Sequence, residues 1–118
     1  MNKYETIIRI TQQGLNETET EERAGILFDS KKMEMHTMLS HEKTHLLSIS
    51  IEDKMVIKKY EMVIRVLNEA RDEFEAGEKA GYLIDIEKMF PNTTISCDPT
   101  RIIARKEPAF RDYKSIAS

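Results

Sequence analysis

The two halves of this chain resemble each other. A shift of 56 positions places residues 3–40 on residues 59–96 without a gap, and sixteen of the thirty-eight aligned residues are then identical. Chance would give roughly two to four identities, so the pattern indicates a tandem duplication. The predicted repeats cover residues 3–51 and 59–107, and residues 108–118 form a tail whose apolar anchors are Phe110 and Tyr113. Any fold proposed for this chain must accommodate two similar units.

Size and composition predict that both repeats belong to one domain. The chain has 118 residues, and one repeat alone is near the length at which a separate hydrophobic core becomes marginal. We therefore expect a single domain over residues 1–118 in which the repeats share a core. The net charge of −3 gives no general attraction to nucleic acid. Cys97 is the single cysteine, and no signal-peptide or membrane-span pattern is visible, so a cytoplasmic setting is expected.

Each repeat begins with a predicted strand. Residues Lys3–Thr11 and Lys59–Leu67 are rich in β-branched side chains and alternate with a period of two. In the first segment, Tyr4, Ile8 and Ile10 share one face, and the aligned residues of the second segment follow the same pattern. Both segments are therefore predicted to be strands with one buried face.

A helix is predicted after each of these strands. Asn16 with Glu19, and Asp72 with Glu75, have the spacing of a cap residue followed by a glutamate that can satisfy amide groups at a helix start. The side chains expected to be buried are, in the first helix, Ala24, Leu27 and Phe28 and, in the second, Ala70, Phe74, Ala80 and Ile84.

A hairpin is predicted to follow each helix. The first would pair Met35–Ser40 with Thr44–Ile51, and the second would pair Asn92–Ser96 with Thr100–Arg105. The repeat then reads β-α-β-β, or β-α-β where the methionine-rich segment stays helical. Two such units predict an α+β sandwich with helices on one face of a mostly antiparallel sheet, and the ferredoxin-like fold is its commonest form.

Two other architectures fit parts of the pattern. A doubled βαβββ barrel is a second arrangement of the same units. The third is a mostly α fold with a long central helix, because apolar residues from Val56 to Ile84 also follow a four-three spacing. Two glycines on that seam and the β-branching from Val56 to Val66 disfavour the helix.

The three histidines form the first candidate site. His36, His41 and His45 fall within ten residues, and imidazole groups are common ligands of zinc and other divalent metals. In the predicted hairpin, His36 and His45 would lie on facing strands. The spacing matches no established zinc signature, and ordinary histidines on a solvated hairpin are the alternative.

A repeated charge pattern forms the second candidate site. Lys3 and Arg9 recur as Lys59 and Arg65, with a glutamate between them in both copies. On neighbouring central strands, these side chains would share the open face of the sheet, where they could bind a phosphate or an acidic partner. Cross-strand ion pairs on a solvated face are the alternative interpretation.

The methionines Met33, Met35 and Met38 form a third cluster, which is typical of core filling or of an adaptable binding surface.

Cys97 lacks a nearby histidine, and the chain contains none of the phosphate-loop, nucleophile-elbow or metalloprotease motifs. The sequence does not identify a cofactor.

These observations favour a small non-enzymatic binding or regulatory module that acts through protein–protein interaction, with a homodimer as the expected assembly. The first alternative is a small-ligand or metal-binding protein, or an enzyme, with a cleft between the two repeats. The second alternative is nucleic-acid binding, with affinity that falls steeply with salt, through a set of basic side chains: Lys54, Lys58, Lys59, Arg65, Arg101, Arg105, Lys106 and Arg111. A membrane role is not expected.

Overall fold

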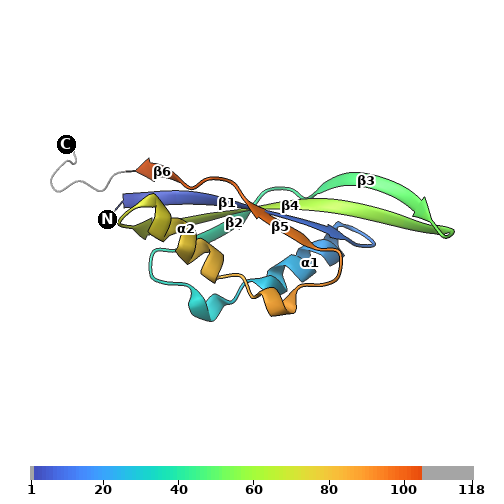
Figure 1. Ribbon diagram of the computed structural model, residues 1–118, viewed down its shortest axis with the longest axis horizontal. Coiled ribbons are helices and arrows are strands. Elements are labelled where there is room, and N and C mark those ends of the chain that lie inside the picture. Colours follow the sequence, from blue (N-terminus) through green and yellow to red (C-terminus); the bar gives the residue numbers. More distant parts are fainter. Residues whose placement is uncertain (1, 105–118) are drawn as a thin grey trace.

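The computed structural model describes residues 2–104 and has an α+β architecture (Figure 1). A six-stranded antiparallel sheet carries two α-helices on one face, as the sequence predicted, and the molecule measures 63 × 25 × 21 Å. The elements in chain order are β1 Asn2–Gln13, α1 Glu17–Leu27, η1 Ser30–Lys32, β2 Met38–His41, β3 His45–Glu52, β4 Met55–Ala70, α2 Glu73–Tyr82, η2 Ile86–Lys88, β5 Thr94–Cys97 and β6 Arg101–Ala104. The predicted tail, residues 108–118, lies outside the described residues.

The centre of the sheet is the long antiparallel pair of β1 and β4. Pairing runs from Asn2 opposite Ala70 to Gln13 opposite Lys59, and Ile8 lies opposite Ile64 at its middle. The strand order is β2-β4-β1-β5. Residues 55–70 are therefore a strand, and the alternative of a long central helix is wrong. The β-branched residues of this segment fit a pleated surface better than a helix, which explains the outcome.

The two predicted hairpins are wrong in their pairing. β2 and β3 do not pair with each other, because both lie along the same edge of β4. In the same way, β5 and β6 both lie along β1. Between β2 and β3, Thr44 is buried and donates its hydroxyl hydrogen to Glu21 of α1, over 2.6 Å. This contact holds the connection against the body, so the chain continues along β4 and does not turn back.

Both helices start where their capping residues predict. The side chain of Asn16 accepts a hydrogen bond from the Glu19 amide at 2.8 Å, and Asp72 accepts one from the Glu75 amide at the same distance. The two glutamates reach back to amide groups before the helices, as in a capping box. The local sequence therefore fixes both helix starts.

The main core lies between the helices and the face of the sheet made by alternate residues of β1 and β4. Its buried members are Ile8, Ile10, Ala24, Leu27, Met62, Ile64, Val66, Ala80 and Leu83. Phe74, predicted to be buried, is 75% exposed. The prediction placed Ala70 and Phe74 in one helix with a single buried side. In the structure, β4 extends to Ala70 and α2 begins at Glu73, so Ala76 and Ala80 face the core.

The ends of the two helices are joined by a short ladder. The Asp29 amide donates to the Leu83 carbonyl at 2.9 Å, and the Asp85 amide donates to the Leu27 carbonyl at 2.7 Å. These reciprocal bonds flank an isolated bridge between Phe28 and Ile84. Backbone hydrogen bonds as well as side-chain packing therefore connect the two helices.

Candidate interaction surface

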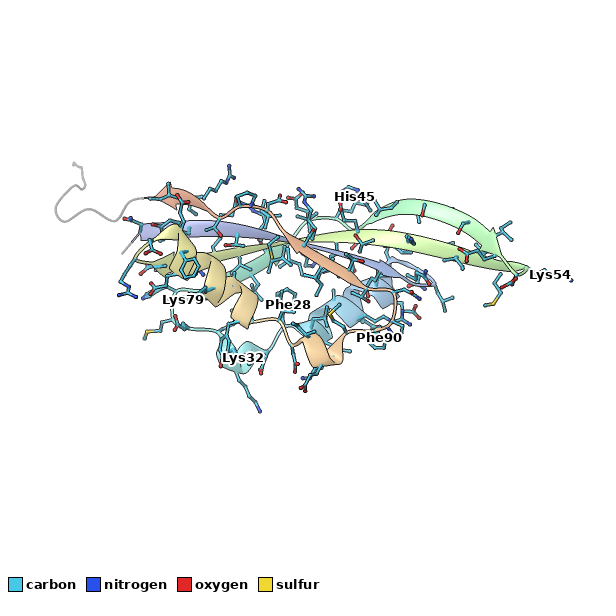
Figure 2. All side chains as sticks on the ribbon, viewed as in Figure 1. Phe28, Lys32, His45, Lys54, Lys79 and Phe90 are labelled. Atoms are coloured by element: carbon cyan, nitrogen blue, oxygen red, sulfur yellow. The ribbon has the colours of Figure 1, made fainter. Side chains whose placement is uncertain are left out.

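The most unusual surface of the molecule is a hairpin that extends beyond the body. It consists of β3 and the first residues of β4, over residues 45–58, and we call it the arm; Lys54 lies at its tip (Figures 1 and 2). All eight residues of β3 are exposed. The arm carries six apolar side chains that are 46–74% exposed, namely Leu46, Leu47, Ile49, Ile51, Met55 and Val56.

A cluster of this kind is unusual on a soluble domain, where single exposed apolar residues are common and contiguous patches are not. Pairing places Ile51 beside Val56 and Ile49 beside Lys58. By strand alternation, Val56 and Lys58 lie on the face that further along β4 is covered by the helices. Ile49, Ile51 and Val56 therefore continue the core face past the point where the helices end, whereas Met55 lies on the opposite face of the arm.

The turn of the arm explains why the chain reverses there. Asp53 and Lys54 have positive φ angles of 49° and 67°, and Glu52 pairs with Met55. Two consecutive residues with φ > 0 between paired strands form a type I′ turn, whose twist matches that of the strands. Aspartate tolerates this conformation well; lysine does so at some cost. The turn fixes the register of the arm.

The outer edge of the arm is open. β3 pairs with β4 and with no other strand among residues 2–104. A long exposed edge with apolar side chains can accept a further strand, and proteins usually protect such an edge with charges, proline or a bulge. Here the one irregularity is a register shift between Leu46 and Ser48. From Ser48 to Glu52 the edge is regular.

A groove of about 380 Å³ lies where the arm leaves the body. The loop after β1 forms one wall, with Leu15 73% exposed, and the first residues of β4 form the other. Apolar surface thus continues from the arm to the body on this side.

The predicted Lys-Glu-Arg face is present on the side of the sheet opposite the helices, and its arginines are engaged in ion pairs. Glu5 is 1% exposed and lies between Arg65 and Arg101. Arg65 donates from Nε over 2.7 Å, and Arg101 donates from Nε over 2.8 Å. The Arg65 hydrogen bond, partly opposed by burial and aided by Arg101, holds the pKa of Glu5 below its ordinary value.

Arg9 takes part in a second ion pair on this face. It donates to both carboxylate oxygens of Asp98, from Nε at 3.2 Å and from Nη2 at 3.0 Å. The bidentate contact raises the pKa of Arg9 and lowers that of Asp98. Glu61 adds a longer contact of 3.7 Å. The two predicted arginines therefore bind acidic side chains of the chain itself.

The remaining predicted basic residues are spread over the molecule. Lys3 and Lys59 are exposed at opposite ends of the β1–β4 pair. Lys54, Lys58 and Lys59 belong to the arm or adjoin it. The predicted nucleic-acid residues Arg105, Lys106 and Arg111 lie outside the described residues, so this interpretation stays a prediction.

The histidines do not face one another. His36 precedes β2, His41 ends β2 and His45 begins β3, and all three are exposed. Since β2 and β3 lie along one edge of β4, the facing strands assumed for His36 and His45 do not form. Within residues 2–104, no three histidine, cysteine, aspartate or glutamate side chains are grouped as a metal site would need. Metal binding stays a prediction without a supporting geometry.

The methionine cluster divides between core and surface. Met33 packs against the core, while Met35 and Met38 are 83% and 64% exposed. Cys97 pairs with Ile8 in the sheet and is exposed, and the partial burial of its thiol, aided by Asp98, raises its pKa. A raised pKa leaves less of the nucleophilic thiolate at neutral pH.

A small cavity of about 60 Å³ lies between α2, η1 and β4, and both halves of the chain line it. Asn68 is 3% exposed, and its side-chain oxygen has no hydrogen-bond partner among the described residues. Lys79 lines the cavity and contacts Glu34 at 3.0 Å, and the ammonium of Lys32 lies 4.6 Å from the Tyr82 ring (Figure 2). The cavity thus combines an unsatisfied acceptor with two cations.

The residues 56 positions before Asn68 and Lys79 make different contacts. Gln12 stands where Asn68 stands in the other half, and it donates to the Thr20 carbonyl. Arg23 stands at the position of Lys79, and its guanidinium stacks over Phe90 at 4.7 Å. Both residues have longer side chains than their counterparts, so the two halves of the chain differ in the residues that line this region.

The arm was missed at the level of sequence, although a signal for it exists. Leu47, Ile49 and Ile51 alternate before a short polar segment, and Met55-Val56-Ile57 follows it. Two apolar runs around a two-residue turn are a hairpin pattern. No glycine or asparagine marks the turn, which is why the pattern was not recognised.

Comparison with protein-family models and with curated protein sequences finds no match for this chain. Within residues 2–104, no helix is long and apolar enough to cross a membrane.

Proposed function

We propose that this protein is a small non-enzymatic binding or regulatory module that contacts protein partners, including a second copy of itself, through the arm. One observation carries the proposal: the arm presents six apolar side chains that are 46–74% exposed. Burial of apolar surface is the main driving force of protein association. The apolar side chains of the arm bury little surface within the described residues. Burying them against a partner would therefore stabilise the complex.

The charges on the open face of the sheet agree with this proposal. Arg65 and Arg9 are held by Glu5 and Asp98, so binding a phosphate there would first require these ion pairs to break. The arm requires no such rearrangement, because its apolar side chains are already presented to solvent.

We also propose that the fold is a duplicated unit of the ferredoxin-like type. In support, helices, short helices and strands recur at a spacing of 56 residues, as in η1 at Ser30–Lys32 and η2 at Ile86–Lys88. The order β2-β4-β1-β5, with helices on one face, is the order expected for two β-α-β units sharing a sheet. On this view β3 and β6 extend the two edge strands.

The test compares two double variants. Ile49→Lys with Ile51→Lys removes apolar surface from the arm, where exposure is 58% and 74%. Phe74→Lys with Ile86→Lys removes exposed apolar residues from the helical side, where exposure is 75% and 73%. Each variant would be cross-linked in an extract of the native host, and the attached proteins would be identified by mass spectrometry. We expect the arm variant to lose partners that the control variant keeps.

A partner set unchanged by the arm variant would refute the proposal. Circular dichroism on both variants checks that the fold is retained, which we expect because all four positions are exposed. A loss of partners in both variants to the same extent would also refute it, since a general effect of added lysines would then explain the result.

The small cavity supports a second candidate, the binding of a small ligand between the two halves. Asn68 offers an acceptor, and Lys32 and Lys79 line the cavity with two positive charges, although Lys79 also contacts the carboxylates of Glu34 at 3.0 Å and Glu75 at 3.9 Å. A small anion that also carries a hydrogen-bond donor, such as bicarbonate or hydrogen phosphate, satisfies both requirements. The volume of about 60 Å³ limits the ligand to this size.

Thermal shift with sodium bicarbonate and with sodium phosphate tests this candidate. The control variant carries Asn68→Gln and Lys79→Arg, which restore the longer side chains found at the equivalent positions Gln12 and Arg23. Stabilisation by either anion in the natural protein, absent in the control, supports the candidate. Equal shifts in both proteins would show a general salt effect and exclude it.

A further inference from the structure

We propose that two copies of this chain associate through their β3 edges, so that the two arms form one four-stranded antiparallel sheet centred on Ser50. This inference rests on the proposed function, because it names the partner and the pairing of the same arm. It follows from the direction of the backbone groups along β3 and from the side chains that the pairing would bring together.

The backbone of β3 is ready for a further strand at two residues. In a hairpin with a two-residue turn, the pair that closes the turn exchanges its hydrogen bonds across the hairpin, and the next pairs alternate. Glu52 closes the turn with Met55, so the backbone groups of Ser50 point toward β4. The amide and carbonyl groups of Ile49 and Ile51 therefore face the open edge.

A second copy presents the same two residues in the opposite direction. When Ser50 of one copy lies opposite Ser50 of the other, Ile49 of each copy lies opposite Ile51 of the other. The amide and carbonyl groups of both residues in each such pair then point toward the partner strand. A twofold axis through Ser50 then satisfies both pairs at once. Such a self-complementary patch is the usual basis of a symmetric dimer.

The apolar side chains agree with this register. Ile51 lies beside Val56 within one arm, and Ile49 lies beside Lys58. Across the new edge, Ile51 of one copy would contact Ile49 of the other, which continues the apolar row without an interruption. Four isoleucines, two from each arm, would then shield one another from water.

The charged side chains of the other face agree as well. Glu52 would lie opposite Ser48 of the second copy, and Ser48 pairs with Lys59 of its own β4, directly after the arm. Serine is short, so the long side chain of Lys59 can reach over it to Glu52 of the other copy. Two such contacts, one on each side of the axis, would favour this register over neighbouring ones.

Disulfide trapping tests the register directly. Ser50→Cys is introduced into the full chain together with Cys97→Ser, which removes the natural thiol. In the proposed dimer the two new cysteines occupy a non-hydrogen-bonded pair, whose Cα atoms are about 4.5 Å apart and therefore within disulfide range. We expect a covalent dimer under mild oxidation with copper–phenanthroline.

Ser48→Cys in the same background is the matched control. It lies on the same face of the same strand and is also exposed, but it is two residues from the axis and faces Glu52 of the other copy. We expect at least tenfold less cross-linked product from Ser48→Cys than from Ser50→Cys. Equal cross-linking at both positions would overturn the register.

Sedimentation of the natural chain over a range of concentrations separates this inference from the proposed function. We expect a monomer–dimer equilibrium whose dissociation constant rises at least tenfold in the variant with Ile49→Lys and Ile51→Lys. A monomer at all concentrations up to about 1 mM overturns the dimer, whereas the extract experiment still decides whether the arm binds another protein. A dimer that the arm variant leaves intact also overturns the inference.

Discussion

The substitution Glu5→Gln tests whether the buried carboxylate on the open face stabilises the fold. Glu5 is 1% exposed, and two arginines donate to it, Arg65 from one side and Arg101 from the other. Glutamine keeps the shape and one acceptor oxygen but removes the negative charge. It also adds an NH₂ group that cannot accept a hydrogen bond from either guanidinium group.

The expected cost is about 2 kcal/mol. Charge-assisted hydrogen bonds contribute roughly 1.5–3 kcal/mol, and removing one partner of a fully buried pair costs about 3–5 kcal/mol. The arginine side chains are 42% and 69% exposed, so water can solvate them after the loss, and the lower part of this range applies. For a domain of this size, about 2 kcal/mol lowers the midpoint of thermal unfolding by roughly 6–12 °C.

Glu61→Gln is the matched control, since Glu61 occupies the position 56 residues after Glu5. Its side chain is 25% exposed, and its recorded contact with Arg9 is 3.7 Å long. A contact of this length on a solvated face contributes less than about 0.5 kcal/mol. Urea unfolding of the natural chain and both variants, followed by circular dichroism, measures the difference in the free energy of unfolding.

The effect of Glu5→Gln should also depend on pH. The pKa of Glu5 is lowered in the folded chain, so its contribution is fully present above the unfolded pKa of about 4.3. It is lost as the pH falls through the lowered folded value, because the natural residue then becomes neutral as well. Equal destabilisation by Glu5→Gln and Glu61→Gln at pH 7, or a difference that does not shrink in acid, would refute this reasoning.

Three further outcomes are expected. Leu27→Ala, in the core, should lower the free energy of unfolding by about 3 kcal/mol, whereas Phe74→Ala, at 75% exposure, should change it by less than about 0.5 kcal/mol. Urea unfolding measures both effects, and equal effects would contradict the orientation of the helices. Asn16→Ala and Asp72→Ala should each cost about 1 kcal/mol through loss of a helix cap, and a cost near zero would show that the caps are not formed in solution. Treatment with EDTA or added Zn²⁺ should shift the midpoint of thermal unfolding by less than about 1 °C, since the described residues hold no group of three metal ligands. A larger shift would contradict this and would favour metal binding by the histidines.

Local patterns predicted the elements of the fold well. The capping residues Asn16 and Asp72 identified both helix starts, because a cap depends on residues within one turn of each other. The alternation in β1 and β4 identified the two central strands and their buried faces, since strand periodicity is a property of the strand itself. Both successes come from interactions between sequence neighbours.

The errors concern contacts between distant residues. The segments β2 and β3 were recognised as strands, but their partner is β4 and not each other. The hydrogen bond from Thr44 to Glu21 holds the connection between these two strands against the body. No sequence pattern predicts this contact, because the two residues are 23 positions apart. The doubled charge pattern was expected on the open face, but the second partner of Glu5, Arg101, lies 96 residues further along the chain. Ion pairing within the face therefore could not be separated from ligand binding by sequence.

The sequence of the arm differs from the aligned sequence in the second half, and this difference bears on the proposed role of the arm. Under the proposed duplication, Ile49, Ile51 and Glu52 correspond to Arg105, Glu107 and Pro108. Charged residues and proline are the usual means of protecting a strand edge, and the aligned sequence of the second half has charged residues where the arm has its two isoleucines. Among residues 2–104, the core lies between the helices and the central strands and does not include the arm, so packing among these residues gives no reason for isoleucines there. Under the proposed function, these isoleucines serve contact with another molecule, and the open edge beside them favours the β3 strand of a second copy as the partner.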